Sequence, residues 1–314
     1  MLKAFLLIVV GLAGDPEHGK TFHKWGTTLA QASERLGVAP GNMAFLVDAP
    51  AEGDEKVTGR ATRDEVTKVL QSFGTRAAAE DVVFVVLIGH GSYDGRAAKF
   101  NMPGPDMTGA DFGALFAKLP TKQVVFVNAA SASGPFVADL SAPGRTVVTA
   151  TRNGAEQYAT LFGGYFIDAL VSDTADGDKN KRVSVLEAFQ FAKAEVTKAY
   201  EREGLLATEH ALLDDNGDKD GSQDPSVTGK DGKVANIVSL GAASAEGLPA
   251  DPKVRALYLE RRELERRVEA LRLLKDSMEP GRYSSELEKL VTAIALKTRE
   301  IRVAEPRKGD QRAM

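Results

Sequence analysis

Short apolar runs alternate with amphipathic segments along the first two hundred residues of the chain. Apolar runs without polar alternation are typical of parallel strands buried on both faces, and apolar residues spaced three and four apart are typical of helices that cover such a sheet. The pattern predicts strands over residues 4–11, 43–48, 82–89, 123–128 and 145–150. It predicts helices over residues 20–36, 62–76, 108–118, 154–172 and 184–203. This alternation indicates an α/β domain with a mostly parallel sheet and helices on both faces.

The last third of the chain follows a different pattern. Residues 205–235 are polar and predict a long surface excursion, after which NIVSL, residues 236–240, is a candidate for a return to the sheet edge. Residues 251–304 carry apolar side chains at near-heptad spacing among many charges, which predicts a coiled-coil-like helical hairpin. We therefore expect an α/β domain over residues 1–245 and a hairpin over residues 251–304. Because the narrow apolar stripe packs on itself, on the main domain or on another chain, this hairpin is where we expect contact with a partner or an oligomer.

Composition excludes several classes of function. The 314 residues are 43% hydrophobic and 27% charged, as in ordinary soluble globular proteins. A formal net charge of −4 supplies no basic stripe, which argues against a nucleic-acid partner. The chain has no cysteine, and this excludes disulfides, thiolate metal ligands and a thiol nucleophile.

The opening residues, MLKAFLLIVVGLAG, have two interpretations. As a secretory signal they offer one lysine, an apolar core and a small-x-small end at Gly11 and Ala13. As a strand they form a β-branched run stopped by Gly11 and Gly14. The run is short for a membrane span, so we expect none. The strand fits the alternation that follows and is preferred. The compartment stays undetermined, with the cytoplasm slightly favoured and export the alternative if residues 1–13 are a signal.

Candidate chemistry gathers at two predicted strand ends, VVLIGHGSYDG and VVFVNAASASG. In parallel sheets the carboxyl ends of strands are where ligands and reacting groups collect. His90 lies between two glycines, which allow a sharp turn and a close approach of substrate. The imidazole is a candidate general base, and the Gly91 N–H is a candidate oxyanion donor. The alternative is a turn histidine that is hydrogen-bonded to a loop.

The order of these elements over roughly residues 4–215 resembles the caspase-type peptidase fold. Within it the chain is most similar to the legumain and GPI-anchor transamidase family, on the opening LLIVVGLAGDPEHGKTFHKWGTTLAQA, the GHG motif, VVFVNAASASG and TVVTATRNGAEQYATLFGGYF. The resemblance implies that His90 is the catalytic base and Gly91 the oxyanion glycine. It also implies a cysteine nucleophile at the second strand end, where this chain has none.

Two positions compete for the place of that cysteine. Counting from the strand through Val127 and Asn128 gives Ala130, whereas counting back from the Ser-Gly pair gives Ser131. Strand register favours Ala130, because a slip of one residue inverts every side chain. The prediction is a pseudo-peptidase that binds peptide or protein without cleaving it. The alternative is an active peptidase or transpeptidase that uses Ser131 with His90.

The resemblance implies further substrate contacts beside this pair. The family's specificity pocket uses a basic residue after the first strand, for which His23 and Lys24 are the candidates here. Asn128 falls on the acidic position of the nucleophile motif and is a third candidate. Asp94 and Arg152 are expected near the rim of the site, with surface salt bridges as the alternative.

The segment DGDKNKRVSVLEAF has the donor spacing of an EF-hand calcium loop. Lys181 stands where such loops have glycine, so it needs a left-handed backbone, and we expect weak calcium affinity. The alternative is a surface turn in which Ser184 and Glu187 form a capping box. The expected ligands are Asp176, Asp178, Asn180, the Arg182 carbonyl, Ser184 and Glu187.

A second acidic run, DDNGDKDGSQD, has oxygen donors at alternate residues but no closing glutamate. A solvated acidic loop explains it equally well. The donors are Asp214, Asn216, Asp218 and Asp220. His210, just before this run, falls in a segment that resembles the border of the family's substrate site, with a surface histidine as the alternative.

Overall fold

The fold is described from a computed structural model of the chain, for residues 3–50, 53–240 and 251–304 except 274, 276 and 277. The chain forms two compact units, Met1–Gly241 and Ala242–Met314. The predicted boundary between the domains falls on residues 241–250, which lie outside the described residues.

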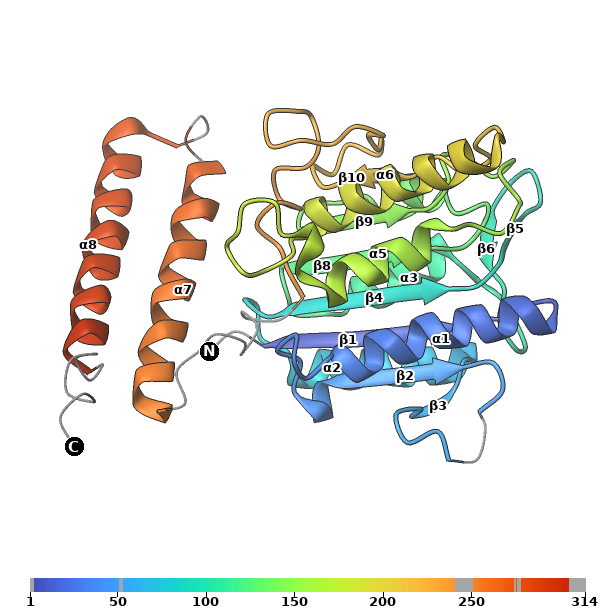
Figure 1. The fold of residues 1–314 in the computed structure, drawn as a ribbon, viewed down its shortest axis with the longest axis horizontal. Coiled ribbons are helices and arrows are strands. Elements are labelled where there is room, and N and C mark those ends of the chain that lie inside the picture. Colours follow the sequence, from blue (N-terminus) through green and yellow to red (C-terminus); the bar gives the residue numbers. More distant parts are fainter. Residues whose placement is uncertain (1–2, 51–52, 241–250, 274, 276–277, 305–314) are drawn as a thin grey trace. The chain divides into compact units, whose positions relative to one another are not determined.

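The first unit contains a seven-stranded sheet in the order β10-β9-β8-β4-β1-β2-β3, parallel except for β10 (Figure 1). Its strands are β1 Ala4–Val10, β2 Met43–Val47, β3 Gly59–Arg60, β4 Val82–Ile88, β8 Gln123–Asn128, β9 Arg145–Thr149 and β10 Leu212–Asp214. A separate three-stranded antiparallel sheet consists of β5 Gly91–Tyr93, β6 Ala98–Phe100 and β7 Met107–Thr108. This architecture confirms the predicted mostly parallel α/β fold.

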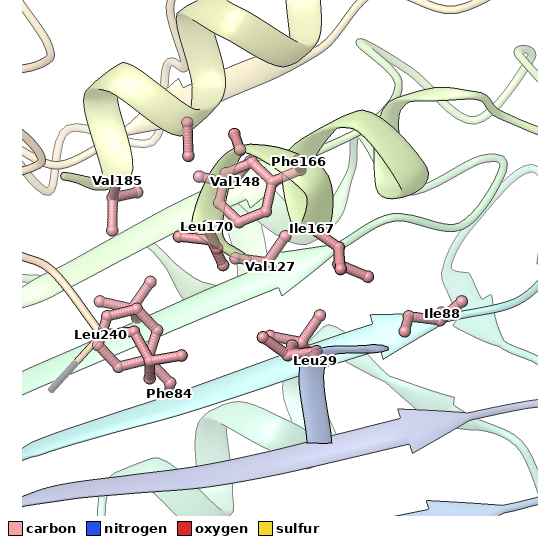
Figure 2. Packing of buried hydrophobic residues seen from close by; sticks show 14 of the residues in the cluster. Leu29, Phe84, Ile88, Val127, Val148, Phe166, Ile167, Leu170, Val185 and Leu240 are labelled. Carbon is pink, nitrogen blue, oxygen red and sulfur yellow. The ribbon is translucent and has the colours of Figure 1, made fainter. Parts of the chain in front are cut away.

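Helices cover both faces of the large sheet. Helices α1, α5 and α6 share one core cluster with alternate residues of β1, such as Leu6 and Ile8, while α2, α3 and α4 share the other with Phe5 and Leu7. Two-sided burial explains why the strands are apolar at every position. Figure 2 shows part of the first cluster, with Phe166 of α5 close to the strands. The helices are α1 Pro16–Ala32, α2 Arg63–Arg76, α3 Gly109–Phe116, α4 Phe136–Leu140, α5 Phe162–Val171 and α6 Val185–Glu203, with 3-10 turns at Pro40–Asn42 and Asp173–Ala175.

Two helix starts differ from the sequence prediction. Helix α1 begins at Pro16 rather than at residue 20, because the Asp15 carboxylate accepts the N–H groups of Glu17 and His18 and so caps an earlier turn. Helix α5 begins at Phe162 rather than at residue 154. Residues 154–161 form a loop instead, and Gly154 in that loop lies so close to the Tyr93 ring that a β-carbon would overlap it.

The edge strand also differs from its expected place. Leu212–Asp214 pairs antiparallel with β9, whereas residues 236–240 form no strand. In that segment Ser239 makes an isolated bridge to Ser184 at the start of α6. The expected return of NIVSL to the sheet edge is therefore wrong, although Val238 and Leu240 are buried in the first core cluster.

The second unit contains helices α7, Pro252–Leu273, and α8, Pro280–Ala304. They pack through a small apolar cluster in which Val268, Leu271 and Leu290 are buried. The Glu279 carboxylate accepts the N–H groups of Gly281 and Arg282 and so caps the start of α8. Among the described helices of both units, none has the length and apolar content that crossing a bilayer requires.

Candidate functional site

The two predicted strand ends lie next to each other. Strands β4 and β8 are parallel neighbours, with Leu87 opposite Asn128. The chain therefore leaves both strands at the same edge of the sheet, where His90 and Gly91 follow β4 and residues 129–134 follow β8.

Ser131 contacts the backbone of Gly91 in both directions. The Gly91 N–H donates to Ser131 Oγ at 3.1 Å, and the Ser131 hydroxyl donates to the Gly91 carbonyl oxygen at 3.2 Å. Ser131 is only 2% exposed. A β-carbon on residue 91 would overlap the Ser131 carbonyl oxygen, so only glycine fits between the two strand ends.

Ala130 points elsewhere. Its side chain is fully buried in the core cluster beneath α2, α3 and α4, and its N–H donates to Asn128 Oδ1 at 3.1 Å. Asn128 is itself fully buried, and its Nδ2 has no hydrogen-bond partner among the described residues. Asn128 thus holds the turn that follows β8, and its expected substrate contact stays a prediction.

The imidazole of His90 is partly buried against the start of α1. Its ring lies 5.1 Å from that of His18 and 5.2 Å from that of Phe22, both at a steep angle. Burial lowers the pKa of His90, and the neighbouring His18 charge lowers it further, against smaller opposing effects of a hydrogen bond to the Ala13 backbone and of Asp15. Within the described part of the chain, no hydrogen bond joins His90 to Ser131.

Sequence reasoning missed the pair of Asp15 and His18 beside His90. Asp15 Oδ2 lies 2.5 Å from His18 Nδ1, and this hydrogen bond lowers the pKa of the Asp15 carboxyl. The Asp-Pro step is a helix-start signal and, taken as one, would have placed His18 on the first turn of α1.

Glu156 is a further residue that the sequence did not indicate. Its carboxylate pairs with His210 Nδ1 at 2.7 Å and with Arg152 Nε at 3.1 Å. Its carbonyl oxygen accepts the N–H of Ala132 at 2.7 Å. Glu156 thus joins the loop after β9 and the segment before β10 to the loop that carries Ser131.

The other predicted residues lie apart from this group. His23 Nε2 is 2.7 Å from Asp54 Oδ2, and Lys24 is exposed on α1. Asp94 pairs with Lys99 at 2.8 Å, which lowers the pKa of that carboxyl. The substrate contacts assigned to His23 and Lys24 stay predictions.

The loop before α6 brings three carboxylates together. Asp176, Asp178 and Glu187 each offer an oxygen within 4.8 Å of the other two. Lys181 has a φ of +65°, the left-handed backbone that its position in a calcium loop requires. The capping box is present as well, since Glu187 Oε2 accepts the N–H and hydroxyl of Ser184 at 2.8 and 2.7 Å.

The chain matches the peptidase C13 family over residues 56–212, which is half of its length and includes His90, Gly91 and Ser131. The chain therefore belongs to the peptidase C13 family, that of legumain and the GPI-anchor transamidase. It is a legumain-like peptidase homologue with a caspase-like fold. No curated protein matches it.

The contact between the strand ends predicts the effect of a substitution at Gly91. Gly91→Ala places a methyl group on the Ser131 carbonyl oxygen, so we expect a loss of about 1–3 kcal/mol in the free energy of unfolding. Urea unfolding followed by fluorescence measures it, because the single tryptophan, Trp25, belongs to α1 of the first unit. Gly41→Ala is the control, since Gly41 faces open space. Equal stability of the two variants would contradict the required close approach.

The environment of His90 predicts a pH dependence. Its folded-state pKa lies below 6.5, so the unfolded chain takes up a proton first as the pH falls. The contribution of His90 to stability is present above pH 6.5 and is lost as the pH falls through its folded pKa. NMR titration of the imidazole C–H, assigned by its loss in His90→Gln, should give a midpoint below 6.5. A midpoint at or above 6.5 would show that burial does not lower the pKa of His90.

Proposed function

We propose that this protein is a pseudo-peptidase that binds an extended peptide or protein segment at the ends of β4 and β8 without cleaving it. The observation that carries the proposal is the set of hydrogen-bond partners of Ser131 Oγ. Both of its contacts are with the backbone of Gly91 and none among the described residues is with His90, whereas a nucleophile activated by His90 has to lie within hydrogen-bond reach of the imidazole.

Two further properties of this pair support the absence of cleavage. Serine has a far higher pKa than cysteine, so without an adjacent base it does not become an effective nucleophile. The Gly91 N–H, which would stabilise an oxyanion, is already bound by Ser131 Oγ. Because Ser131 contacts Gly91 while Ala130 faces the core, the geometry favours Ser131 as the position of the family's cysteine, the reverse of the expectation from strand register.

Exposed apolar side chains near the strand ends support peptide binding. Leu12 follows β1 and is 42% exposed, while Tyr158 and Leu161 follow β9 and are 73% and 40% exposed. Since β1 and β9 flank β4 and β8 in the sheet, these side chains lie on both sides of the His90 and Ser131 loops. Exposed aromatic and aliphatic groups around buried polar groups are typical of surfaces that bind proteins.

An active peptidase that uses Ser131 with His90 is the alternative, favoured by the position of both residues at the same edge of the sheet, just after the neighbouring strands β8 and β4. Labelling with a fluorophosphonate probe and turnover of a fluorogenic peptide panel separate the two functions. We expect the wild type, His90→Ala and Ser131→Ala to give the same background signal. Labelling or turnover that is lost in both variants would establish the peptidase instead.

Peptide binding by the same chain is measured separately from cleavage. An array of immobilised decapeptides identifies sequences that the wild type retains, and their affinities are then compared across variants. We expect Tyr158→Ala to weaken binding about tenfold, as for loss of a central aromatic contact. Val227→Ala, an exposed apolar side chain after β10, should leave it unchanged. A chain that retains no peptide, or retains peptides equally in both variants, would overturn binding at this surface.

The proposal includes a calcium ion in the loop before α6. The three carboxylates within 4.8 Å of each other and the left-handed backbone of Lys181 support it, with the Asn180 side chain, the Ser184 hydroxyl and the Arg182 carbonyl as the remaining donors. Glu187 would have to exchange its bonds with Ser184 for the ion, so we expect weak affinity, with a Kd of about 10⁻⁴–10⁻³ M.

Thermal unfolding in EDTA and in 10 mM calcium tests this loop. At that affinity calcium stabilises the fold by about 1.4–2.7 kcal/mol, and Asp178→Asn should reduce the increase in Tm. Glu201→Gln, which removes an exposed carboxylate from α6, is the matched control and should behave as the wild type. An Asp178→Asn response equal to that of the wild type would remove this calcium site.

Contact of residues 251–304 with a partner or with a second copy of the chain stays a prediction. The narrow cluster of Val268, Leu271 and Leu290 shows that α7 and α8 pack on each other.

A further inference from the structure

The polar segment after β10 contains two buried carboxylates that lack a full set of partners. Asp214 ends β10, and Asp231 lies seventeen residues further along the chain. Both residues are 0% exposed. One oxygen of each, Oδ2, is buried and has no hydrogen-bond partner among the described residues. Buried carboxylate oxygens are normally hydrogen-bonded, paired with a cation or bound to a metal.

The chain folds back so that these two residues become neighbours. The Asp215 N–H donates to Asp231 Oδ1 at 3.3 Å. In the other direction, the Asp215 carboxylate accepts the N–H groups of Gly232 and Ala235 at 3.0 and 2.8 Å. The Asp231 carboxyl group therefore lies directly against the peptide that joins Asp214 to Asp215.

Backbone N–H groups bind the carboxylate of Asp215, but they leave one oxygen each of Asp214 and Asp231 without a hydrogen bond among the described residues. Asp214 Oδ1 accepts the N–H groups of Asn216 and Gly217, and nothing described binds its Oδ2. The nearby ammonium of Lys230 pairs with Asp218 at 2.9 Å and with Asp220 at 2.7 Å, both on the exposed side of the loop. The carboxylates of Asp214 and Asp231 therefore do not pair with the Lys230 ammonium.

The buried carboxylates of Asp214 and Asp231 lack a neighbouring positive charge among the described residues. Asp214 and Asp231 are both fully buried, and the carboxylate of Asp215, which is also buried, lies beside them. An unpaired carboxylate in the interior is destabilising, and a bound cation offsets that cost.

We propose that Asp214 and Asp231 bind a calcium ion through their Oδ2 atoms, at a site separate from the loop before α6. A donor set made only of oxygens fits a hard divalent cation. With only two carboxylates as ligands, the affinity is in the weak range, with a Kd of about 10⁻⁴–10⁻³ M.

The position in the fold indicates what this ion does. Strand β10 runs antiparallel to β9, so the chain after Asp214 leaves toward the amino end of β9 and away from the edge with His90. The ion joins residues 214–215 to residues 231–235, where Ala235 belongs to the first core cluster. It therefore fastens the long polar excursion to the sheet and takes no part at the ends of β4 and β8.

Calorimetric titration of the full chain with calcium, together with thermal unfolding, tests the site. Asp231→Asn keeps an acceptor for the Asp215 N–H but removes the charge. We expect it to weaken calcium binding at this site at least tenfold, and to leave Tm in EDTA unchanged or raised because a buried charge is gone. Asp224→Asn, in the same polar segment but with an exposed carboxylate outside the acidic donors named for this run, should bind calcium as the wild type does.

Each outcome decides the proposal. Calcium heats and Tm increases that are the same in Asp231→Asn and the wild type overturn it, as does a wild type that binds no calcium beyond what Asp178→Asn removes. A magnesium response equal to that of calcium overturns the assignment of the ion. Asp214→Asn is the second variant and should lose the same binding event, which covers a failure of Asp231→Asn to fold. Because Asp178→Asn reports only on the other loop, the two calcium sites succeed or fail separately.

Discussion

The approach of two backbones, at Gly91 and Ser131, is the constraint on which the rest of the site depends. The Ser131 hydroxyl bonds to both the N–H and the carbonyl of Gly91, and the Ser131 carbonyl occupies the space where any side chain of residue 91 would lie. Because β4 and β8 are parallel neighbours, this contact closes the carboxyl edge of the sheet between them. It also fixes how the chain leaves β4, and hence the direction in which the His90 imidazole turns toward α1.

Further hydrogen bonds connect the Ser131 loop to two neighbouring loops. Ala132 has a left-handed backbone, with a φ of +52°, and donates its N–H to the Glu156 carbonyl. The Glu156 carboxylate in turn holds Arg152 and His210. Three segments distant in sequence are therefore joined by a short series of hydrogen bonds, and the exposed Tyr158 and Leu161 belong to one of them. A surface held in this way is preorganised, which lowers the entropy that ligand binding costs.

The strands could be predicted because they are buried on both faces. The helix starts and loops that the sequence pattern missed depend on helix caps and on contacts between distant segments. The strand at Val82–Ile88 was expected at residues 82–89. A run that is apolar at every position is stable as a strand only where both faces are buried, as in the centre of a parallel sheet. The start of α1 depended on one carboxylate, Asp15, and the loop at 154–161 has the composition of a helix but is held by contacts to other segments. Strand register favoured Ala130 over Ser131, but register applies only where the chain is extended, and β8 ends at Asn128 before both residues. The closeness of Asp214 and Asp231 depends on a fold-back that no local pattern indicates.

These contacts change what a retained motif means. The resemblance to legumain-type peptidases implies a catalytic histidine followed by glycine at this strand end, and the presence of His90 and Gly91 would ordinarily argue for catalysis. In this chain packing alone requires Gly91, and His90 fills a partly buried place between His18 and Phe22. Both residues therefore have structural reasons to be there that do not involve a reaction. Under the proposed function, cleavage would need a proton to pass from Ser131 to the imidazole, and the contacts of Ser131 Oγ are instead with the backbone of Gly91. The fold of a peptidase and the proposed absence of cleavage are thus compatible, because packing holds the residues that build the site and the chain has no thiol to act as the nucleophile of a cysteine peptidase.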